Sequence, residues 1–271
     1  MKIISWNVYG LGNPRGLRTL CDLVKMEAPD ILFLQETRLK AHEFEVCKFK
    51  LGFVNYLVVD CQGRKGGLTV LWGRDIHLLI LNYSHCHVDA LIDDDPRKGS
   101  WFFIGIYGFP EVSQRSRTWD LLRQLVRYNG EAWIVIGDFN ELLHHNEKWG
   151  GRPRPYWQIS AFRDVVNDCC LRDMGFKGNK FTWSNRRGGS LCTSERLDRA
   201  LANQPWWGKF LNASVIHRLE AYSDHVPIWV KTEGKRAALV FEDSLSLKKC
   251  GWESRHVRIL LRLLEGVVKG E

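Results

Sequence analysis

Two short, unbroken apolar runs constrain the fold of this chain more than any other feature. They are Ile31–Leu34 and Ala132–Ile136. Runs of this length without polar interruption are typical of strands covered on both faces, as in α/β sheets. A carboxylate stands just beyond each run, Glu36 after the first and Asp138 after the second. Strand ends are places where a rigid scaffold presents polar groups to a ligand.

Polar strings of this kind occur at five places along the chain. Each one sets an acid, an amide or an imidazole at the edge of an apolar run, and the strings are Ser5-Trp6-Asn7, Gln35-Glu36-Thr37, Gly137-Asp138-Phe139-Asn140, Arg196-Leu197-Asp198 and Ser223-Asp224-His225. Several acids with one His, and no suitable nucleophilic triad, indicate a hard metal ion and phosphate chemistry. Taken singly, each string is explained as well or better by a turn or a cap.

The string around Asp138 predicts a shared pocket. Residues two apart along an extended chain face the same side, so we expect Asp138 and Asn140 to point together while Phe139 packs inward. An ionised acid beside a neutral amide suits the orientation of a water and a phosphoryl oxygen. Glu36, at the mouth of a buried strand, is a suitable ligand for a hard metal ion. Asn7 ends the first strand in the same way.

The last string contains two groups with different expected tasks. Asp224 and His225 are neighbours before the strand-like run 226–230, so their side chains project to different sides. We expect Asp224 to join Glu36 at a metal and His225 to contact the scissile phosphate. A catalytic His works best when an acid fixes its tautomer, and Asp198 is the candidate for that role.

The rest of the pattern predicts a layered α/β protein. Helices are expected over 14–27, 115–128 and 158–169, and an antiparallel meander over 56–59, 68–72, 77–81, 88–92 and 101–107. Mixed strands at both ends with few helices indicate two packed sheets with helices outside. The pattern weakens from Gly234, so we expect one domain over 1–233. Residues 234–271 are expected to be an irregular extension with a short helix over 257–268.

The net charge of +8 favours polyanionic partners, although a solvated surface explains it equally well. Eight Cys occur without a CxxC pair, so no structural zinc site is expected. Met1 leads directly into the first expected strand, which predicts no signal peptide. No apolar run approaches the ~20 residues of a membrane span, so no membrane partner is expected. We therefore predict an intracellular protein.

As an ordered set, the strings resemble the endonuclease/exonuclease/phosphatase superfamily, which includes exonuclease III, apurinic/apyrimidinic endonucleases and deoxyribonuclease I. The resemblance spans roughly residues 1–231, and the matching residues are Ile4-Ser-Trp-Asn7, Leu34-Gln-Glu-Thr37, Tyr107, Ile136-Gly-Asp-Phe-Asn140, Arg196-Leu-Asp198 and Ser223-Asp-His-Val-Pro227. It implies a four-layer α/β sandwich, with two mixed β-sheets packed face to face and helices outside.

The chain is still more similar to the endonuclease domain of plant LINE-type (non-LTR) retrotransposons. The residues that carry this resemblance are Trp6–Pro14, Gly137–Leu143, Glu147–Gly151, Phe181–Asn185 and Glu195–Leu201. Tyr9 departs from the pattern, because those elements usually carry Arg there. The chain also stops before any reverse transcriptase, so it resembles a free-standing or truncated endonuclease domain.

The resemblance implies a role for each polar string. It implies that Glu36 binds Mg²⁺ or Mn²⁺ with Asn7 and Asp224 nearby. It also implies catalytic roles for a set of five residues, which are Asp138, Asn140, His225, Tyr107 and Asp198. In this scheme Asp138 orients or deprotonates the attacking water, and Tyr107 and His225 contact the phosphate.

The function implied is nicking of DNA to leave a 3′-hydroxyl and a 5′-phosphate, and a nuclear location is inferred from that substrate alone. Arginines on expected surface loops are candidate contacts to the DNA backbone, and they are Arg152, Arg154, Arg186 and Arg187. Trp183 is expected either to pack against the duplex or to lie in the core.

Two other functions stay open. The same scaffold hosts inositol-phosphate phosphatases, sphingomyelinases and RNA deadenylases, so the fold alone does not settle the substrate. The chain is alternatively a catalytically idle retroelement remnant that binds nucleic acid or has no function. Tyr9 and the irregular tail after Gly234 favour this second alternative, whereas none of the principal catalytic positions is substituted.

Overall fold

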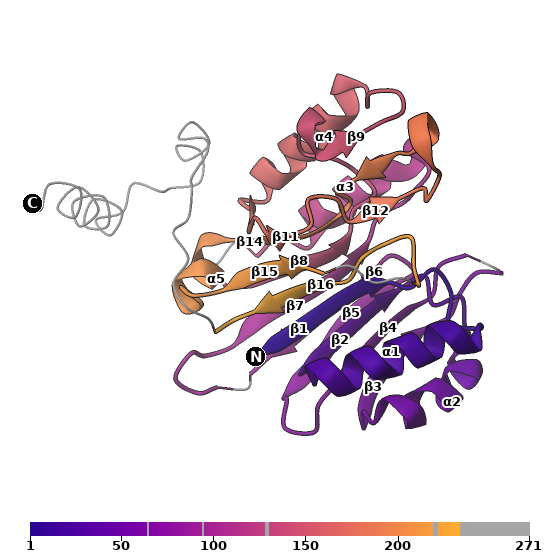
Figure 1. Cartoon of the computed structure of the whole chain (residues 1–271). Helices are drawn as coiled ribbons and strands as arrows, with labels where there is room; N and C mark the ends of the chain where they lie inside the picture. The colour runs from indigo at the N-terminus through magenta and orange to yellow at the C-terminus, as the bar shows by residue number, and fades with distance from the viewer. Residues whose placement is uncertain (64, 94, 128–129, 219–221, 234–271) are drawn as a thin grey trace, which may run out of the picture. The chain divides into compact units, whose positions relative to one another are not determined.

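The computed structural model describes residues 1–63, 65–93, 95–127, 130–218 and 222–233. Figure 1 shows the arrangement of the elements. The helices are α1 (Pro14–Glu27), α2 (Ala41–Leu51), α3 (Arg115–Gln124), α4 (Tyr156–Asp168) and α5 (Gln204–Lys209). The strands are β1 (Lys2–Asn7), β2 (Ile31–Gln35), β3 (Asn55–Val59), β4 (Leu68–Trp72), β5 (Leu78–Ser84), β6 (His87–Ile92), β7 (Trp101–Tyr107), β8 (Trp133–Asp138), β9 (Lys148–Trp149), β10 (Arg172–Asp173), β11 (Lys177–Gly178), β12 (Trp183–Ser184), β13 (Ser194–Glu195), β14 (Asp198–Ala202), β15 (Ser214–His217) and β16 (Ile228–Lys231).

The described strands form two large mixed sheets and one small one. The seven-stranded sheet has the order β11-β15-β16-β1-β2-β4-β3, and the six-stranded sheet has the order β10-β14-β8-β7-β6-β5. The small sheet has the order β12-β13-β9. Each large sheet contains one central parallel pair, β1 with β2 and β7 with β8. Most of the other pairings are antiparallel.

The two large sheets pack face to face through a shared apolar core. Phe33 of β2 meets Phe103 of β7 edge to face, with ring centroids 6.2 Å apart. Gly105 of β7 lies against the Phe33 ring, and a Cβ there would come within 2.7 Å of it. Side chains at native packing density leave no room for such an atom, so this approach requires glycine.

Helices cover the outer face of each large sheet (Figure 1). On the seven-stranded sheet, α1 and α2 bury apolar side chains against β1, β2 and β4 in one cluster. On the six-stranded sheet, α3 and α4 form a second cluster with β7, β8 and β14, in which Trp119 stacks on Phe162. The chain is therefore a four-layer α/β sandwich, as the sequence predicted.

Local sequence explains where α1 begins and ends. Asn13 caps the helix, because its side-chain oxygen accepts a hydrogen bond from the backbone N–H of Arg15 at 2.9 Å. Pro14 occupies the first turn, where its missing N–H costs nothing. Ala28 ends the helix in a left-handed conformation just before Pro29. Leu17, Leu20 and Leu23 lie on the buried face.

Four features of the observed elements differ from the prediction. The predicted meander is divided between the two sheets, because β3 and β4 pair beside β2 while β5, β6 and β7 pair beside β8. Helix α2 was not predicted, and the exposed Val46 and Phe49 obscure the stripe formed by its buried apolar residues. The short helix α5 was also missed. Helix α3 ends at Gln124, earlier than expected.

The expected extension over 234–271, with its helix over 257–268, lies outside the described residues. None of the described helices has the length and apolar character needed to span a lipid bilayer.

The topology brings the predicted polar residues to one edge of the sandwich. Asn7 and Gln35 are register partners at the ends of parallel strands β1 and β2, and Tyr107 and Asp138 are partners at the ends of β7 and β8. Because parallel strands end at the same side of a sheet, each sheet presents two polar ends together. The first residue of antiparallel β14 is Asp198, the cross-strand partner of Asp138.

Candidate active site

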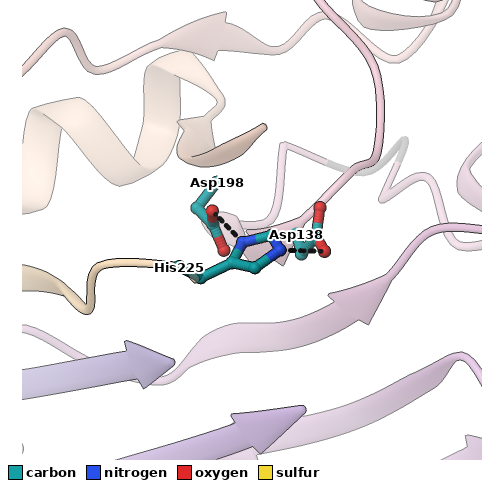
Figure 2. Close-up of side chains that lie close together, drawn as sticks. All are labelled: Asp138, Asp198 and His225. Atoms are coloured by element: carbon teal, nitrogen blue, oxygen red, sulfur yellow. Dashed lines mark hydrogen bonds and ion pairs between the residues drawn. The ribbon is translucent and has the colours of Figure 1, made fainter. Parts of the chain in front are cut away.

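A buried imidazole lies between two buried carboxylates at this edge (Figure 2). Nδ1 of His225 lies 2.8 Å from Oδ2 of Asp198, and Nε2 lies 3.8 Å from Oδ2 of Asp138. The second distance exceeds hydrogen-bonding range. When His225 is protonated, Nδ1–H donates to Asp198. Nε2–H then remains available to a ligand that enters beside Asp138.

The two carboxylates set the charge of His225. Burial by itself lowers the pKa of an imidazole, but the negative charges of Asp198 and Asp138 outweigh it and raise the pKa of His225 to about 10. His225 is therefore an imidazolium at neutral pH. Its orientation is fixed from behind, since its backbone N–H donates to Ser223 Oγ at 3.1 Å and its carbonyl accepts from the Trp6 indole at 3.1 Å.

Asp138 is surrounded by amide donors. Its Oδ1 accepts the backbone N–H of Asn140 at 2.8 Å, and its Oδ2 accepts Nδ2 of Asn7 at 3.0 Å. Nδ2 of Asn140 lies 3.3 Å from Oδ2 and also donates to the Gly108 carbonyl at 2.9 Å. Burial raises the pKa of Asp138 to about 7, although the positive charge of His225 acts in the opposite direction. A carboxylate tuned to this range can accept a proton near neutral pH.

Asn7 links Asp138 to a second carboxylate, that of Glu36. Nδ2 of Asn7 lies 3.3 Å from Oε1 of Glu36, and the Tyr107 hydroxyl donates to the same oxygen at 2.7 Å. Burial and the charges of Glu36 and Asp138 raise the pKa of Tyr107, so its phenol stays protonated. Oε2 of Glu36 pairs with the Arg38 guanidinium at 2.9 Å. These contacts connect the ends of both large sheets.

Two of the site residues have unusual backbone conformations. Glu36 has φ of 50° and Asn140 has φ of 54°. Non-glycine residues with positive φ are uncommon and gather at functional sites. The finding corrects our reason for pairing Asp138 with Asn140, because they meet through this turn and not along an extended strand. Phe139 is fully buried, as expected.

Asp224 and His225 face different partners, as their adjacency predicted. Oδ2 of Asp224 accepts the Trp183 indole N–H at 2.9 Å, and Oδ1 lies 3.4 Å from Ser223 Oγ. Ser223 Oγ also donates to the Asn7 carbonyl at 2.6 Å. Among the described residues no hydrogen bond joins Asp224 to Glu36. The expected grouping of Asp224 with Glu36 at one metal therefore stays a prediction.

A buried ion-pair network fixes the chain on both sides of Asp198. Arg196 and Arg199 flank it in sequence and both pair with Glu147 and Asp173, at 2.8 to 3.0 Å. Arg199 is fully buried, so its charge depends on these partners. In the sequence, Arg196 was recognisable only as part of a string. Glu147 and Asp173 were missed, because an acid remote in sequence gives no signal of such pairing.

The predicted nucleic-acid contacts fall into two groups. Arg152, Arg186 and Arg187 are exposed on loops. Arg154 is instead partly buried and pairs with Glu195, which Lys148 also contacts. This pairing favours a structural role for Arg154 over a contact to DNA. Trp183 is half-buried against the small cluster that contains Leu197, which agrees more closely with the core alternative than with the duplex alternative.

The donors at this edge fit a divalent cation. Glu36 and Asp138 supply carboxylate oxygens, and Asn7 supplies an amide oxygen that accepts the Tyr9 N–H at 3.2 Å. Oxygen donors of this kind are those that Mg²⁺ and Mn²⁺ prefer. A second compact set of possible ligand atoms comes from Asp138, Asp198 and His225, whose atoms lie within 4.8 Å of one another. Because His225 is already bonded to Asp198 and charged, Glu36 and Asn7 are the better candidates for the ion.

One contact at Glu36 was not predicted. Arg38 stands two residues after Glu36, and its guanidinium lies 3.9 Å from the centre of the Tyr9 ring. The sequence shows a basic residue directly after the Gln35-Glu36-Thr37 string. The direction of its side chain was not predictable, because that direction depends on the positive φ of 55° at Arg38.

Comparison with known proteins finds one family and several solved structures to which this chain is similar. The sequence profile of the Endonuclease/Exonuclease/phosphatase family matches residues 4–225. The structure of an AP endonuclease from Leishmania major superposes with a TM-score of 0.67 and 17% identity, covering 84% of this chain and 86% of that one. A 3′-5′ exonuclease from Neisseria meningitidis gives 0.65 and 20%, covering 85% and 99%.

The endonuclease domain of TRAS1, a telomere-specific non-LTR retrotransposon, gives a TM-score of 0.63 and 14% identity, covering 87% of this chain and 99% of that one. At these identities the likeness shows the fold alone. A search of the curated proteins finds no significant match.

Proposed function

The chain belongs to the endonuclease/exonuclease/phosphatase family, and we propose that it is a divalent-metal-dependent endonuclease that nicks DNA. The contact set around Asp138 carries the proposal. Asp138 accepts amide donors from Asn7 and Asn140 and faces an imidazolium, His225, that has a free Nε2–H. This arrangement provides a base for water and a cation for a phosphoryl oxygen at one place.

Each group has a definite task in hydrolysis of a phosphodiester. Asp138 accepts a proton from the attacking water, since its raised pKa leaves it basic enough near neutral pH. Asn7 and Asn140 hold the carboxylate in position. His225 donates Nε2–H to a phosphoryl oxygen and offsets its growing negative charge. Asp198 keeps His225 protonated and oriented.

The bonds formed and broken define the products. The water oxygen bonds to phosphorus while the bond from phosphorus to the 3′ oxygen breaks. The departing 3′ oxygen takes up a proton from solvent water, so one product carries a 3′-hydroxyl and the other a 5′-phosphate. Tyr107 remains a phenol, so it can donate a hydrogen bond to Glu36 or to the phosphate.

We assign a Mg²⁺ or Mn²⁺ ion to Glu36 and Asn7, with Asp224 contributing directly or through water. When bound, such an ion offsets charge on the phosphate and on the leaving oxygen. Asp224 is oriented for this by the hydrogen bond that its Oδ2 accepts from the Trp183 indole N–H. If Asp224 contributes, Asp224→Asn should weaken Mn²⁺ binding and leave the pKa of His225 nearly unchanged.

DNA is the proposed substrate because of both charge and sequence resemblance. The net charge is +8, and the loop residues Arg152, Arg186 and Arg187 are exposed. Such arginines bind phosphates without reading sequence. The strings shared with plant LINE-type elements support an origin in a retrotransposon, where a nick would prime reverse transcription. A nuclear location would follow from that substrate.

The experiment compares three substrates in Mg²⁺: supercoiled plasmid DNA, poly(A) RNA and a soluble phosphoinositide. We expect nicked plasmid with 3′-hydroxyl ends, little action on the other two, and loss of nicking in Glu36→Ala and Asp138→Ala. Arg123→Gln, which removes a distant exposed charge, should nick normally.

Other results would point to the alternative functions. Preferential cleavage of RNA or phosphoinositide would identify a phosphatase or deadenylase. Filter binding of DNA without any cleavage would identify an idle remnant. Equal nicking by wild type and both Ala variants would remove the catalytic assignment altogether.

A further inference from the structure

Arg38 contacts Glu36 on the oxygen that its other partners leave open. Asn7 and Tyr107 both contact Oε1, whereas Arg38 donates to Oε2 at 2.9 Å. A carboxylate oxygen offers about two lone pairs. Oε1 is therefore filled by its two donors, and Oε2 is where a metal ion would most readily approach Glu36. Arg38 occupies part of that same oxygen.

The fold holds Arg38 in this position. Its guanidinium carbon lies 3.9 Å from the centre of the Tyr9 ring, and its backbone N–H donates to the Gly66 carbonyl at 3.0 Å. A Cβ at Gly10 would come within 3.3 Å of Cδ of Arg38. Tyr9 itself is tied to the proposed metal ligand Asn7 through its N–H, at 3.2 Å. The backbone of Arg38 is therefore fixed, and its guanidinium stays packed against the Tyr9 ring beside Glu36.

The pairing of Arg38 is nevertheless incomplete. Its side chain is 33% exposed, and its Nε, although buried, has no hydrogen-bond partner among the described residues. A guanidinium has five donors in a planar fork that matches a phosphate. Arg38 therefore retains the capacity to bind a second anion while Tyr9 supports its face.

Charge makes Arg38 and a metal ion antagonists at Glu36. A divalent ion on Glu36 would bring two positive charges close to the guanidinium, and like charges this close repel each other. The guanidinium of Arg38 therefore lowers the affinity of Glu36 for a metal ion, and a bound metal ion weakens the contact between Arg38 and Glu36 to the same extent. A DNA phosphate would add negative charge beside the guanidinium, and its oxygens match the planar fork of guanidinium donors.

Building on the proposed function, we propose that Arg38 makes metal affinity depend on DNA. In the free protein Arg38 competes with the metal for Glu36. When a DNA phosphate enters, Arg38 turns to that phosphate, and the competition ends. Arg38 is thus a positioning residue that couples the two ligands, and Tyr9 is the surface on which it turns.

The test measures Mn²⁺ affinity in the absence and presence of DNA, by electron paramagnetic resonance of the free ion. The DNA is a short duplex with phosphorothioate linkages, which resist cleavage. Glu36→Ala identifies the ion bound at this site. Arg38→Gln is compared with Arg38→Lys, which keeps the charge, and with Arg123→Gln, which removes a distant charge. Tyr9→Asn removes the ring from a left-handed position that Asn tolerates.

Without DNA, we expect Arg38→Gln to bind Mn²⁺ about fivefold more tightly than wild type, as a partly buried ion pair allows. Tyr9→Asn should shift in the same direction, and Arg38→Lys and Arg123→Gln should change little. DNA should tighten Mn²⁺ binding strongly in wild type and weakly in Arg38→Gln.

Unchanged or weaker Mn²⁺ binding in Arg38→Gln would overturn this proposal while leaving nicking by wild type intact. An equal effect of DNA in wild type and Arg38→Gln would overturn it as well. Absence of both nicking and Mn²⁺ binding in wild type would instead remove the proposed function, and this inference with it.

Discussion

Replacing Asp198 with Asn should change the charge of His225 at working pH. Asp198 Oδ2 lies 2.8 Å from Nδ1 of His225, and both side chains are buried. An opposite charge this close shifts a pKa by roughly 1 to 3 units, and one unit corresponds to about 1.4 kcal/mol. Asn keeps the shape and removes the charge. Because both groups are buried and in direct contact, we expect a shift of roughly 2 to 3 units, which lowers the pKa of His225 from about 10 to roughly 7 to 8.

The sign follows from which form of His225 is needed. The imidazolium donates to the phosphate, so nicking is lost as pH rises through the pKa of His225. At pH 8.5, wild type would remain almost fully protonated and Asp198→Asn would be mostly neutral. The rate ratio of wild type to variant should therefore grow about fourfold or more between pH 6.5 and pH 8.5, as the shifted titration requires.

Two measurements check this reasoning. Nitrogen NMR of the His225 ring in metal-free protein gives the pKa directly, and single-turnover nicking gives the pH profile. Asp120→Asn, on the exposed side of α3, removes the same charge far from His225. An Asp198→Asn protein whose imidazole is still charged at pH 9, or whose rate ratio is flat with pH, would refute the assignment.

Three further predictions concern the supporting structure. Glu147→Gln breaks ion pairs to Arg196 and Arg199, and we expect urea unfolding to show a free energy of unfolding lower by about 3 kcal/mol, because two buried arginines are then left to share the single carboxylate of Asp173. A loss under about 1 kcal/mol would contradict this. Arg196 and Arg199 outweigh burial and lower the pKa of Glu147 and Asp173, so both acids stabilise the fold above their unfolded values near 4 and lose that contribution as pH falls further. Urea midpoints should therefore drop below about pH 4 in wild type and less steeply in Glu147→Gln, whereas equal slopes would argue against the network. Thr182→Val removes the hydroxyl that accepts the backbone N–H groups of Leu197 and Asp198, both at 2.9 Å. It should lower the free energy of unfolding by about 1 to 3 kcal/mol and slow nicking. Thr193→Val is the matched control on an adjacent loop.

The large elements were predictable because their cause is local. The apolar run Ile31–Leu34 predicts strand β2, and the cap at Asn13 followed by Pro14 predicts the start of helix α1. The division of the meander between two sheets was not predictable from periodicity, because β4 and β5 have similar apolar patterns and differ only in their distant partners. Helix α2 was missed because exposed Phe49 breaks its apolar stripe.

In the candidate site, too, contacts with a local cause were predictable and contacts set by distant or unusual backbone were not. The sequence predicted His225 with Asp198, because each string marks a strand end, and their geometry requires only that β14 and β16 start at one edge. It did not predict Arg38 against Glu36, because that contact depends on left-handed backbone at both residues. Nor did it predict the role of Arg154, since its partner Glu195 is 41 residues away.

Asp138 and His225 are proposed to act on one phosphate at one site, and a double-mutant comparison of nicking rates distinguishes this from two independent roles. Single-turnover rates in Mg²⁺ would be measured for wild type, Asp138→Asn, His225→Gln and the double variant. Groups that act together on one transition state are strongly non-additive. We predict large losses in both single variants and little further loss in the double variant. A single variant that nicks at the wild-type rate, or losses that simply multiply, would contradict the account.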